Sequence, residues 1–462
     1  MATAIIDDLL KVARRPFQSI TSGSINRRIF GAATAIAAVT IWVKLAAMVK
    51  EMLVAWRFGT RDDLDAFTLA LVLPFTLINV FAVPFRTAFL PLYIHTDERE
   101  GQRPAARLLA GAMLWISGLL LILTLLMVLT GPLYLPLLAS GFSPNKLRLT
   151  FHLLCFLSPL VLLSGLSELW GGILNARGRF ALVAALPIIS AALTIVLLQR
   201  ADVWGVWALL AGMIAGAILE LGVLGFCLKQ QRISLDWKDV WRSLRTDLRG
   251  VQGHAATLMT GSLLMSGVSI ICASLLARFP AGSLAAFSYA NKIVALPIGL
   301  LSVALNTAAA PFLAQLTARQ EWSYLRQTLM RYISLIFGFA VPVTAGLFLL
   351  AQPVTSLLLQ RGAFAANDSR LVANLLACLA LQLPFYIASG FVVQMLIAMQ
   401  ATRAVLLISA CNLLVLLVLS PWLSARFGIA GVALAISAMY FVAFWLAYLF
   451  AAHRIKIYNA PV

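Results

Sequence analysis

The chain has 462 residues, of which 62% are hydrophobic and 11% are charged, and its mean hydropathy is +0.95. Soluble domains are about 45–50% apolar, so this composition excludes a soluble globular protein. The formal net charge of +18 does not indicate nucleic acid binding, because the basic residues lie in short loops between apolar runs.

The chain begins with an amphipathic stretch over residues 1–28. Apolar residues such as Ile5 and Leu9 are interspersed there with Lys11 and Arg14. No apolar run in it is long enough for a signal peptide, so the pattern favours a helix lying on the cytoplasmic membrane surface.

About twelve apolar runs follow, each long enough to cross roughly 30 Å of hydrocarbon. An even number of spans puts both termini on one side of the membrane, and more than half of the 35 Lys and Arg residues lie in loops of that side. The positive-inside rule identifies that side as the cytoplasm, here of a bacterial inner membrane. The expected spans are 29–50, 66–92, 106–131, 148–172, 181–199, 204–227, 254–278, 283–310, 329–351, 371–398, 404–423 and 428–451.

The longest internal connection, 229–250, is also amphipathic. Trp237 and Trp241 share one helical face, and Lys238 and Arg242 lie on another, which favours an interfacial helix on the cytoplasmic leaflet over a solvated linker. This linker separates an N-lobe (29–228) from a C-lobe (251–452). A cytoplasmic tail (453–462) follows the C-lobe.

The two lobes resemble each other in sequence. Six helices repeated in one orientation form a parallel repeat with a central cavity between the lobes, which is the expected binding site. The matching residues lie about 220 positions apart: Ala66-Phe67, Thr87-Ala88 and Pro91 in the N-lobe, and Ala286-Phe287, Thr307-Ala308 and Pro311 in the C-lobe.

Ionisable residues cluster in three of the expected spans. Each costs about 2.5–3.5 kcal/mol on insertion, so each needs a partner, an aqueous cavity or a function. The clustered residues are Lys44, Lys50 and Glu51 in the first span, Asp65 at the start of the second, Arg86 within it, and Lys292 in the eighth. Their excess of positive charge predicts an anionic ligand, and lysine is a good point-charge partner for a diphosphate.

Two interpretations of these residues remain open. In the cavity interpretation the four cations bind the diphosphate, and Glu51 and Asp65 form ion pairs that gate the cavity. In the structural interpretation Lys44 pairs with Glu51, Lys50 snorkels to the interface, and Lys292 bonds helix-end carbonyls.

Glu168 and Glu220, in the fourth and sixth spans, fit either a structural hydrogen-bonding role or the binding of a coupling ion. The five cysteines show no paired spacing, and there is no metal-ligand spacing, Gly-rich phosphate loop or nucleophile elbow. The sequence therefore predicts no metal and no cofactor apart from a possible coupling ion. It favours a transporter over an enzyme.

Three segments resemble the MurJ/MviN family of the MOP superfamily, whose members flip lipid II. The first contains Lys50-Glu51-Met52, Phe58-Gly59-Thr60 and Asp65-Ala66-Phe67, the second Tyr289-Ala290-Asn291-Lys292, and the third Gln360-Arg361-Gly362-Ala363-Phe364 with Asp368. The resemblance implies a MATE-like two-lobed fold. It also implies that Lys44, Lys50 and Lys292 stand where the family places cavity arginines, and that Asp65 matches an aspartate at the periplasmic mouth.

The chain departs from this family pattern in two places. Ile78-Asn79 replaces an arginine pair, and Val83-Pro84 replaces a Glu-Gly pair. Many family members also have two further helices after the twelfth span, which form a groove for the lipid tail. These departures favour an exopolysaccharide repeat unit as the cargo and put lipid II second.

The sequence thus predicts a flippase that moves an undecaprenyl-diphosphate-linked saccharide by alternating access. Membrane lipids and glycan synthesis or export machinery are its expected partners. A MATE-type drug or ion antiporter is an alternative, although a carrier of cationic drugs should line its cavity with acids. A membrane glycosyltransferase or polymerase is a second alternative, which should show paired carboxylates or a large external loop.

Overall fold

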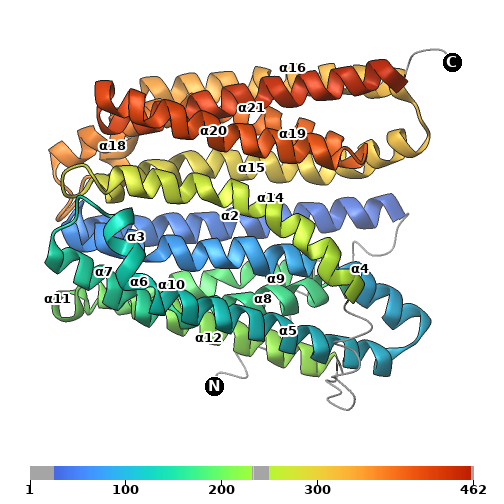
Figure 1. Ribbon diagram of the computed structural model, residues 1–462, viewed down its shortest axis with the longest axis horizontal. Helices are drawn as coiled ribbons and strands as arrows, with labels where there is room; N and C mark the ends of the chain where they lie inside the picture. The colour runs from blue at the N-terminus through green and yellow to red at the C-terminus, as the bar shows by residue number, and fades with distance from the viewer. Residues whose placement is uncertain (1–24, 232, 234–248, 459–462) are drawn as a thin grey trace.

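The computed structural model describes residues 25–231, 233 and 249–458, and the regular elements within them are helices (Figure 1). Among the described residues, 10 helices are long and apolar enough to cross a membrane, or up to 11 if one bent pair counts as a single span. Helix α2 (Ile25–Phe58), of 34 residues, is a further long helix outside that count. The predicted all-helical polytopic fold is confirmed.

The N-terminal half comprises α2 to α12. Its other elements are α3 (Asp62–Leu77), the π-helix η1 (Ile78–Ala82), α4 (Val83–Arg99), α5 (Gln102–Leu129), α6 (Gly131–Leu138), α7 (Pro144–Leu157), α8 (Pro159–Ala176), α9 (Phe180–Ala185), α10 (Pro187–Leu198), α11 (Ala201–Trp204) and α12 (Trp207–Gln230). The predicted amphipathic segment 1–28 and linker 229–250 lie mostly outside the described residues.

The C-terminal half comprises α14 to α21. Its elements are α14 (Arg249–Leu276), α15 (Ser283–Ala318), α16 (Trp322–Leu349), α17 (Ala351–Leu359), α18 (Ala366–Ala380), α19 (Leu383–Ala398), α20 (Thr402–Phe427) and α21 (Ile429–Tyr458). Helix α21 therefore continues into the segment that was predicted to be a tail.

Prolines explain why several expected spans are interrupted helices. A proline lacks the N–H of the helical ladder and its ring crowds the carbonyl four residues earlier, so a helix tends to break just before it. Pro159, Pro187 and Pro384 each stand at the start of a new helix, and the break before Pro384 bends α18 against α19 by 41°. In the second span Pro84 follows η1, a wider turn that absorbs the missing hydrogen bond without ending the span.

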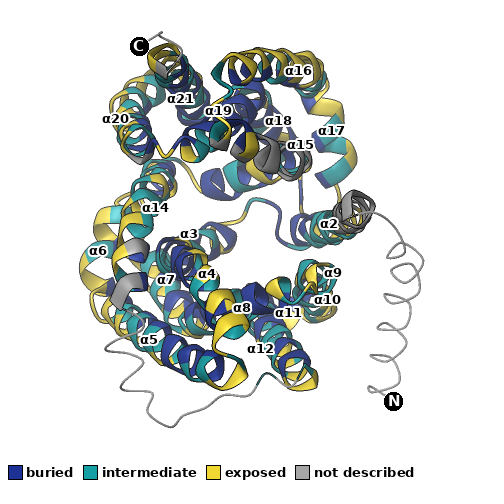
Figure 2. Cartoon of the chain, turned by 90° about the vertical axis from the view of Figure 1, so that its right-hand side faces the viewer, coloured by how far each residue is buried: buried dark blue, intermediate teal, exposed yellow. Residues whose placement is uncertain are grey.

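The first helix of each half lies between the lobes, as expected for a parallel repeat. Helix α2 packs against α9 and α10 of its own half and against α15 of the other, while α14 packs against α20 of its own half and against α3, η1 and α4 of the other. Viewed along the helices, α2 and α14 stand on opposite sides between the two groups (Figure 2). Each first helix thus packs against the opposite lobe, which is what a twofold axis along the membrane normal produces.

The backbone repeats as well. Positive φ angles recur at turns that are equivalent in the two halves, at Gly101 and Gln320 and at Gly178 and Gln400. Before α12 and α21 the paired residues are Gly205, with φ 54° and ψ −139°, and Gly428, with φ 59° and ψ −138°. The two halves thus share turn geometry even where one uses glycine and the other glutamine.

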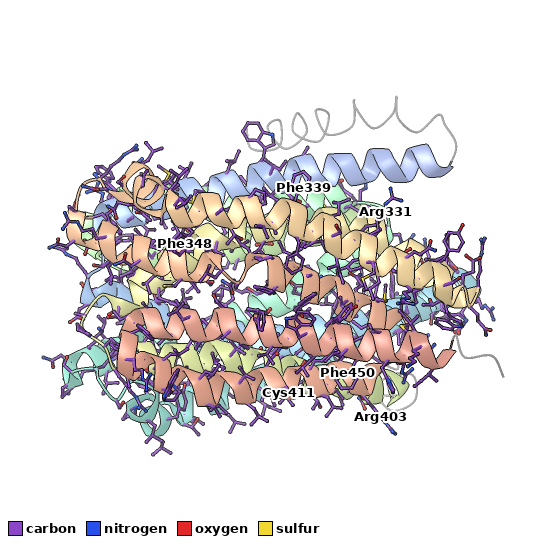
Figure 3. All side chains as sticks on the ribbon, turned by 90° about the horizontal axis from the view of Figure 1, so that it is seen from above. Arg331, Phe339, Phe348, Arg403, Cys411 and Phe450 are labelled. Carbon is purple, nitrogen blue, oxygen red and sulfur yellow. The ribbon has the colours of Figure 1, made fainter. Side chains whose placement is uncertain are left out.

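The outer surface is apolar along most of its length. Phe339 and Phe348 on α16 are 64% and 48% exposed, and Figure 3 shows them on the flank of the bundle, with Arg331 and Arg403 nearer the end where α21 terminates. Helix α2 begins at that same end (Figure 1). Exposed phenylalanines on a flank suit lipid contact.

Candidate functional site

A cavity of about 400 Å³ lies between the two lobes. Helices α2, α3, α10 and α12, with η1, line it from the N-terminal half, and α14 and α15 line it from the C-terminal half. Its wall is mostly apolar, with hydroxyl groups such as Thr68 and Ser288, the amide of Asn79, and one group of charges. A cavity built from both lobes changes shape when the lobes rock, which is what alternating access needs.

The charges in this cavity form a triad that joins the two lobes. The Nζ of Lys292 on α15 lies 2.7 Å from Oε2 of Glu51 on α2, and the Nζ of Lys50 lies 3.0 Å from Oε1 of the same carboxylate. The Lys292 side chain is 46% exposed and that of Glu51 only 10%. The structural interpretation is wrong, because Lys50 and Lys292 both bind Glu51, whereas the ammonium of Lys44 lies beside Gly299.

The triad carries one net positive charge and unused donors. Each ammonium has three N–H groups, and the bond to Glu51 uses one of them. Glu51 is the one acidic side chain among the described residues that line this cavity. The arrangement can therefore bind an anion with two or more oxygens. Its net positive charge disfavours the binding of a cationic drug.

The other two predicted cations lie elsewhere. The ammonium of Lys44 lies beside Gly299 of α15, and Lys44 is not among the residues that line the cavity. Arg86 is also absent from that lining, and its Nη1 lies 2.8 Å from Oε2 of Glu168. The predicted cluster of cations therefore divides into a cavity pair, Lys50 and Lys292, and two residues outside the cavity.

Glu168 and Glu220 lie in the N-lobe, on α8 and α12. Glu168 is paired with Arg86, and the aliphatic part of that arginine packs against Gly172. Glu220 interacts electrostatically with Glu168 and has no cationic partner among the described residues. The two acids thus differ, since Glu168 is paired with an arginine and Glu220 has no cationic partner among the described residues.

One end of the bundle is closed by contacts between the lobes, and we call it the closed end. It is formed by the loops 59–61, 139–143, 277–282 and 360–365. Asp65, which is 2% exposed, accepts hydrogen bonds from the backbone N–H groups of Gly282 at 2.7 Å and Ala285 at 2.8 Å. A carboxylate of the N-lobe thereby caps the N-terminus of α15, whose own cap residue is a glycine without a side chain.

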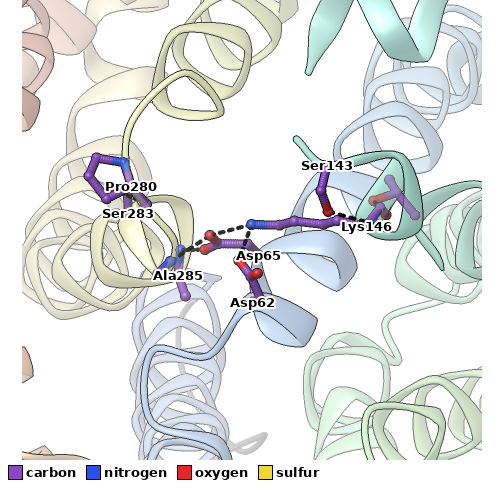
Figure 4. A network of polar contacts seen from close by, with 9 residues as sticks. Asp62, Asp65, Ser143, Lys146, Pro280, Ser283 and Ala285 are labelled. Atoms are coloured by element: carbon purple, nitrogen blue, oxygen red, sulfur yellow. Dashed lines mark hydrogen bonds and ion pairs between the residues drawn. The ribbon is translucent and has the colours of Figure 1, made fainter. Parts of the chain in front are cut away.

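Lys146 completes this network (Figure 4). Its Nζ lies 3.0 Å from Oδ2 of Asp65 and 2.6 Å from Oδ1 of Asp62, and its side chain is only 9% exposed. Ser143 caps the start of α7 by accepting the N–H of Lys146, which places the lysine at this point. Asp65 is thus buried with charge and hydrogen bonds satisfied.

The segments that carried the family resemblance meet at the closed end. Thr60 donates a hydrogen bond of 2.6 Å to Asp368, and the hydroxyl of Tyr289 donates one of 3.3 Å to the carbonyl of Gly59. The ring of Tyr289 also meets that of Phe364, with centroids 5.6 Å apart. The two hydrogen bonds join the two lobes, and the ring contact joins two of the segments within the C-lobe, so these three segments are parts of one closure.

Glycines allow the backbones to approach at this end. A Cβ at Gly59 would lie 2.5 Å from the carbonyl oxygen of Ala363, and a Cβ at Gly282 would collide with Thr60. Both glycines also have positive φ angles, 56° and 86°. A side chain at either position would therefore both strain the turn and hold the lobes apart.

A second compartment of about 380 Å³ adjoins the cavity and extends into the C-lobe. The two share the lining residues Thr68, Val72, Ser269 and Ser288. The second compartment continues past Asn291 to α19 and α21.

Several of these residues carry little signal in the sequence. Lys146 stands in a loop like many other lysines, and only the serine-proline helix start before it marks its position. Gln382 and Tyr386 of the second compartment are isolated polar residues in a long apolar run, without a pattern that indicates a site.

The family model described as "Lipid II flippase MurJ" matches residues 54–462. A protein of Synechocystis sp. named "Probable lipid II flippase MurJ" is 27% identical over 434 residues, which cover 90% of this chain and 80% of that protein.

Two solved structures have a similar fold. One, described as "Lipid II flippase MurJ, inward closed conformation", gives a TM-score of 0.77 at 23% identity and covers 90% of this chain and 87% of its own. The other is an inward-facing multidrug resistance MATE family transporter of the MOP superfamily, with a TM-score of 0.70 at 16% identity and coverages of 92% and 99%. At these identities the two structures support the fold alone.

Proposed function

The chain belongs to the MurJ family of the MOP superfamily, and we propose that it flips an undecaprenyl-diphosphate-linked saccharide across a bacterial inner membrane. As a family member it is a multi-pass membrane transporter rather than an enzyme. The observation that carries the proposal is the pair of ammonium groups, Lys50 and Lys292, held by one carboxylate in a cavity between the lobes.

The geometry supports a mechanism in which the substrate competes with Glu51. A diphosphate entering the cavity draws the ammonium groups of Lys50 and Lys292 toward its own oxygens and so weakens the tie between α2 and α15. The two lobes are then held together mainly at the closed end. Rocking of the lobes opens that end and releases the substrate on the other side.

We place lipid II first as the cargo, because the family description and the Synechocystis relative carry that name. The sequence analysis put an exopolysaccharide repeat unit first, and the comparisons support that cargo less. It remains a second candidate because Asn79 lines the cavity, at a position where the family resemblance leads us to expect an arginine.

Complementation distinguishes the two cargoes. In a bacterium depleted of its own lipid II flippase, the wild-type chain at ordinary expression should restore growth and peptidoglycan synthesis, whereas a Lys50→Ala, Lys292→Ala variant should not. If wild type fails to restore growth, and deleting its gene stops one surface polysaccharide without killing the cell, the cargo is the exopolysaccharide unit and lipid II is excluded.

The orientation follows from the charge asymmetry and gives a direct prediction. In a variant without its five native cysteines, cysteines at Asn145 or Ala366, both exposed at the closed end, should react with an impermeant thiol reagent added to intact cells. A cysteine at Gln102, which is exposed at the opposite end, should stay unlabelled until the membrane is permeabilised. Labelling of the Gln102 position alone in intact cells would reverse the proposed topology, in which both termini are cytoplasmic.

We also propose Glu220 as the carboxyl group that binds a coupling ion. It has no cationic partner of its own among the described residues, unlike Glu168. Glu168 itself, neutralised by Arg86, fits a structural role.

A further inference from the structure

The second compartment differs in chemistry from the cavity that contains the triad. No charged side chain is present among the described residues that line it. Its polar groups are amides and hydroxyls, contributed by Asn291, Gln382, Tyr386 and Tyr440 together with serines shared with the cavity. An uncharged wall of this kind does not stabilise a bound ion. It favours a neutral ligand with several hydrogen-bonding groups.

The most buried of these polar groups lacks a protein partner. Gln382 is 3% exposed, and its side-chain amide has no hydrogen-bond partner among the described residues, although it borders the compartment. Buried amides in folded proteins are nearly always hydrogen-bonded, because an unpaired one costs free energy. The Gln382 amide is not among the side-chain atoms that are fully shielded from solvent, so it faces the compartment. A hydrogen-bonding ligand there replaces water on the amide, whereas an apolar ligand leaves the amide unpaired.

Two tyrosines form an aromatic corner beside this amide. The rings of Tyr386 and Tyr440 meet edge to face with centroids 4.7 Å apart, and neither hydroxyl has a partner within the described part of the chain. Tyr386 is one turn after Gln382 on the same segment, so their polar groups lie on neighbouring positions of one helical face. Sugars combine hydroxyl groups with flat C–H faces, and such a corner suits both.

The second compartment lies directly beside the triad. Asn291 and Lys292 are consecutive on α15, and Asn291 lines the second compartment while Lys292 lines the cavity. Ser288, one turn earlier, lines both. A ligand that places an anionic group on Lys292 can therefore extend past Ser288 and Asn291 into the uncharged compartment without leaving the protein.

We propose that the second compartment, with Gln382, Tyr386, Tyr440 and Asn291, is the subsite that binds the saccharide of the substrate while its diphosphate occupies Lys50 and Lys292. This inference rests on the proposed function and deepens it, because it assigns the two chemical parts of the ligand to two adjoining spaces. The saccharide is thereby bound mainly by the C-lobe and the diphosphate by both lobes.

A pair of short-chain probes tests this assignment. Purified full-length protein in lipid nanodiscs is titrated with farnesyl diphosphate and with a farnesyl-diphosphate-linked N-acetylated disaccharide. Wild type should bind the sugar-bearing probe at least tenfold more tightly than the bare diphosphate. Gln382→Leu and Tyr386→Phe should each remove most of this advantage and leave the affinity for the bare diphosphate within about twofold.

Two further variants serve as controls. Lys292→Ala should weaken both probes alike, since it acts on the part they share. Tyr332→Phe removes a tyrosine hydroxyl of the C-lobe outside both compartments, where the ring stacks on Phe391, and should change neither affinity.

The possible failures are distinguishable. If wild type binds both probes equally, or if Gln382→Leu and Tyr386→Phe weaken both probes alike, the saccharide subsite is wrong and the proposed flippase function stands. If wild type binds neither probe, the proposed function fails and the subsite fails with it.

Discussion

Replacing Lys292 by alanine should lower the rate of substrate flipping by about 10- to 150-fold, because a hydrogen bond to a charged group contributes roughly 1.5–3 kcal/mol. The fold should survive this change, since Glu51 keeps Lys50 as its partner at 3.0 Å. Lys292→Arg retains the charge and should keep part of the activity. The measurement is flipping of a lipid-linked saccharide in proteoliposomes, normalised to protein level.

Removing both cavity lysines should abolish flipping. That variant leaves Glu51 buried without a counter-charge, which costs about 3–5 kcal/mol of stability and could be mistaken for a loss of function. The same variant carrying Glu51→Gln avoids the unpaired charge and should be equally inactive but well folded.

The matched control is Arg326→Ala, which removes an exposed arginine from α16 outside both compartments. It should have wild-type activity. Full activity of the Lys50→Ala, Lys292→Ala protein would mean that these lysines only balance the charge of Glu51 and do not bind the substrate.

The membrane-spanning helices were largely predictable from sequence, because an apolar run long enough to cross the hydrocarbon layer rarely forms another structure. The interruptions were not assigned, although the prolines that cause them were visible. Short helices such as α6 and α11, which lie at the closed end, are too brief to produce a periodic signal, and the extension of α21 to Tyr458 crosses into a charged segment.

The cluster of charges was also predictable, because each ionisable residue inside a membrane demands an explanation. Its pairing was not predictable from periodicity. Glu51 and Lys292 are 241 positions apart, so helical spacing within one span suggested Lys44 as the partner instead. The bond between the Asp65 carboxylate and the backbone of Ala285, 220 positions away, likewise follows only from how the two lobes pack.

The internal repeat is visible in the sequence, and the closed end is built from equivalent parts of its two halves. It was predicted from matching residues, and the structure adds that α2 and α14 exchange sides at the lobe interface. The network of Asp65 is asymmetric within this repeat, since a carboxylate of the N-lobe caps a helix of the C-lobe. The Asp65 carboxylate is therefore one of the contacts that must break when the closed end opens, together with those of Thr60 and Tyr289.

Asp65→Asn should shift the protein toward conformations in which the closed end is open. The substitution removes the charge that Lys146 pairs with. It also replaces one acceptor oxygen by an NH2 group, which is a donor and cannot accept the N–H of Gly282 or Ala285. Losing about 3 kcal/mol of closure would change the ratio of open to closed forms by roughly 150-fold. Flipping should slow, because a carrier that seldom closes this end seldom accepts substrate from the other side.

A cysteine at Thr68 reports this opening. Thr68 lines both compartments behind the closed end, so an impermeant thiol reagent added from that side reaches it only when the end opens. In a chain without its native cysteines, Asp65→Asn should raise the rate of labelling many-fold. Asp63→Asn is the matched control, because Asp63 is exposed two residues earlier and has no partner among the described residues. Equal labelling in the two variants would show that Asp65 serves the stability of the lobes and does not control their opening.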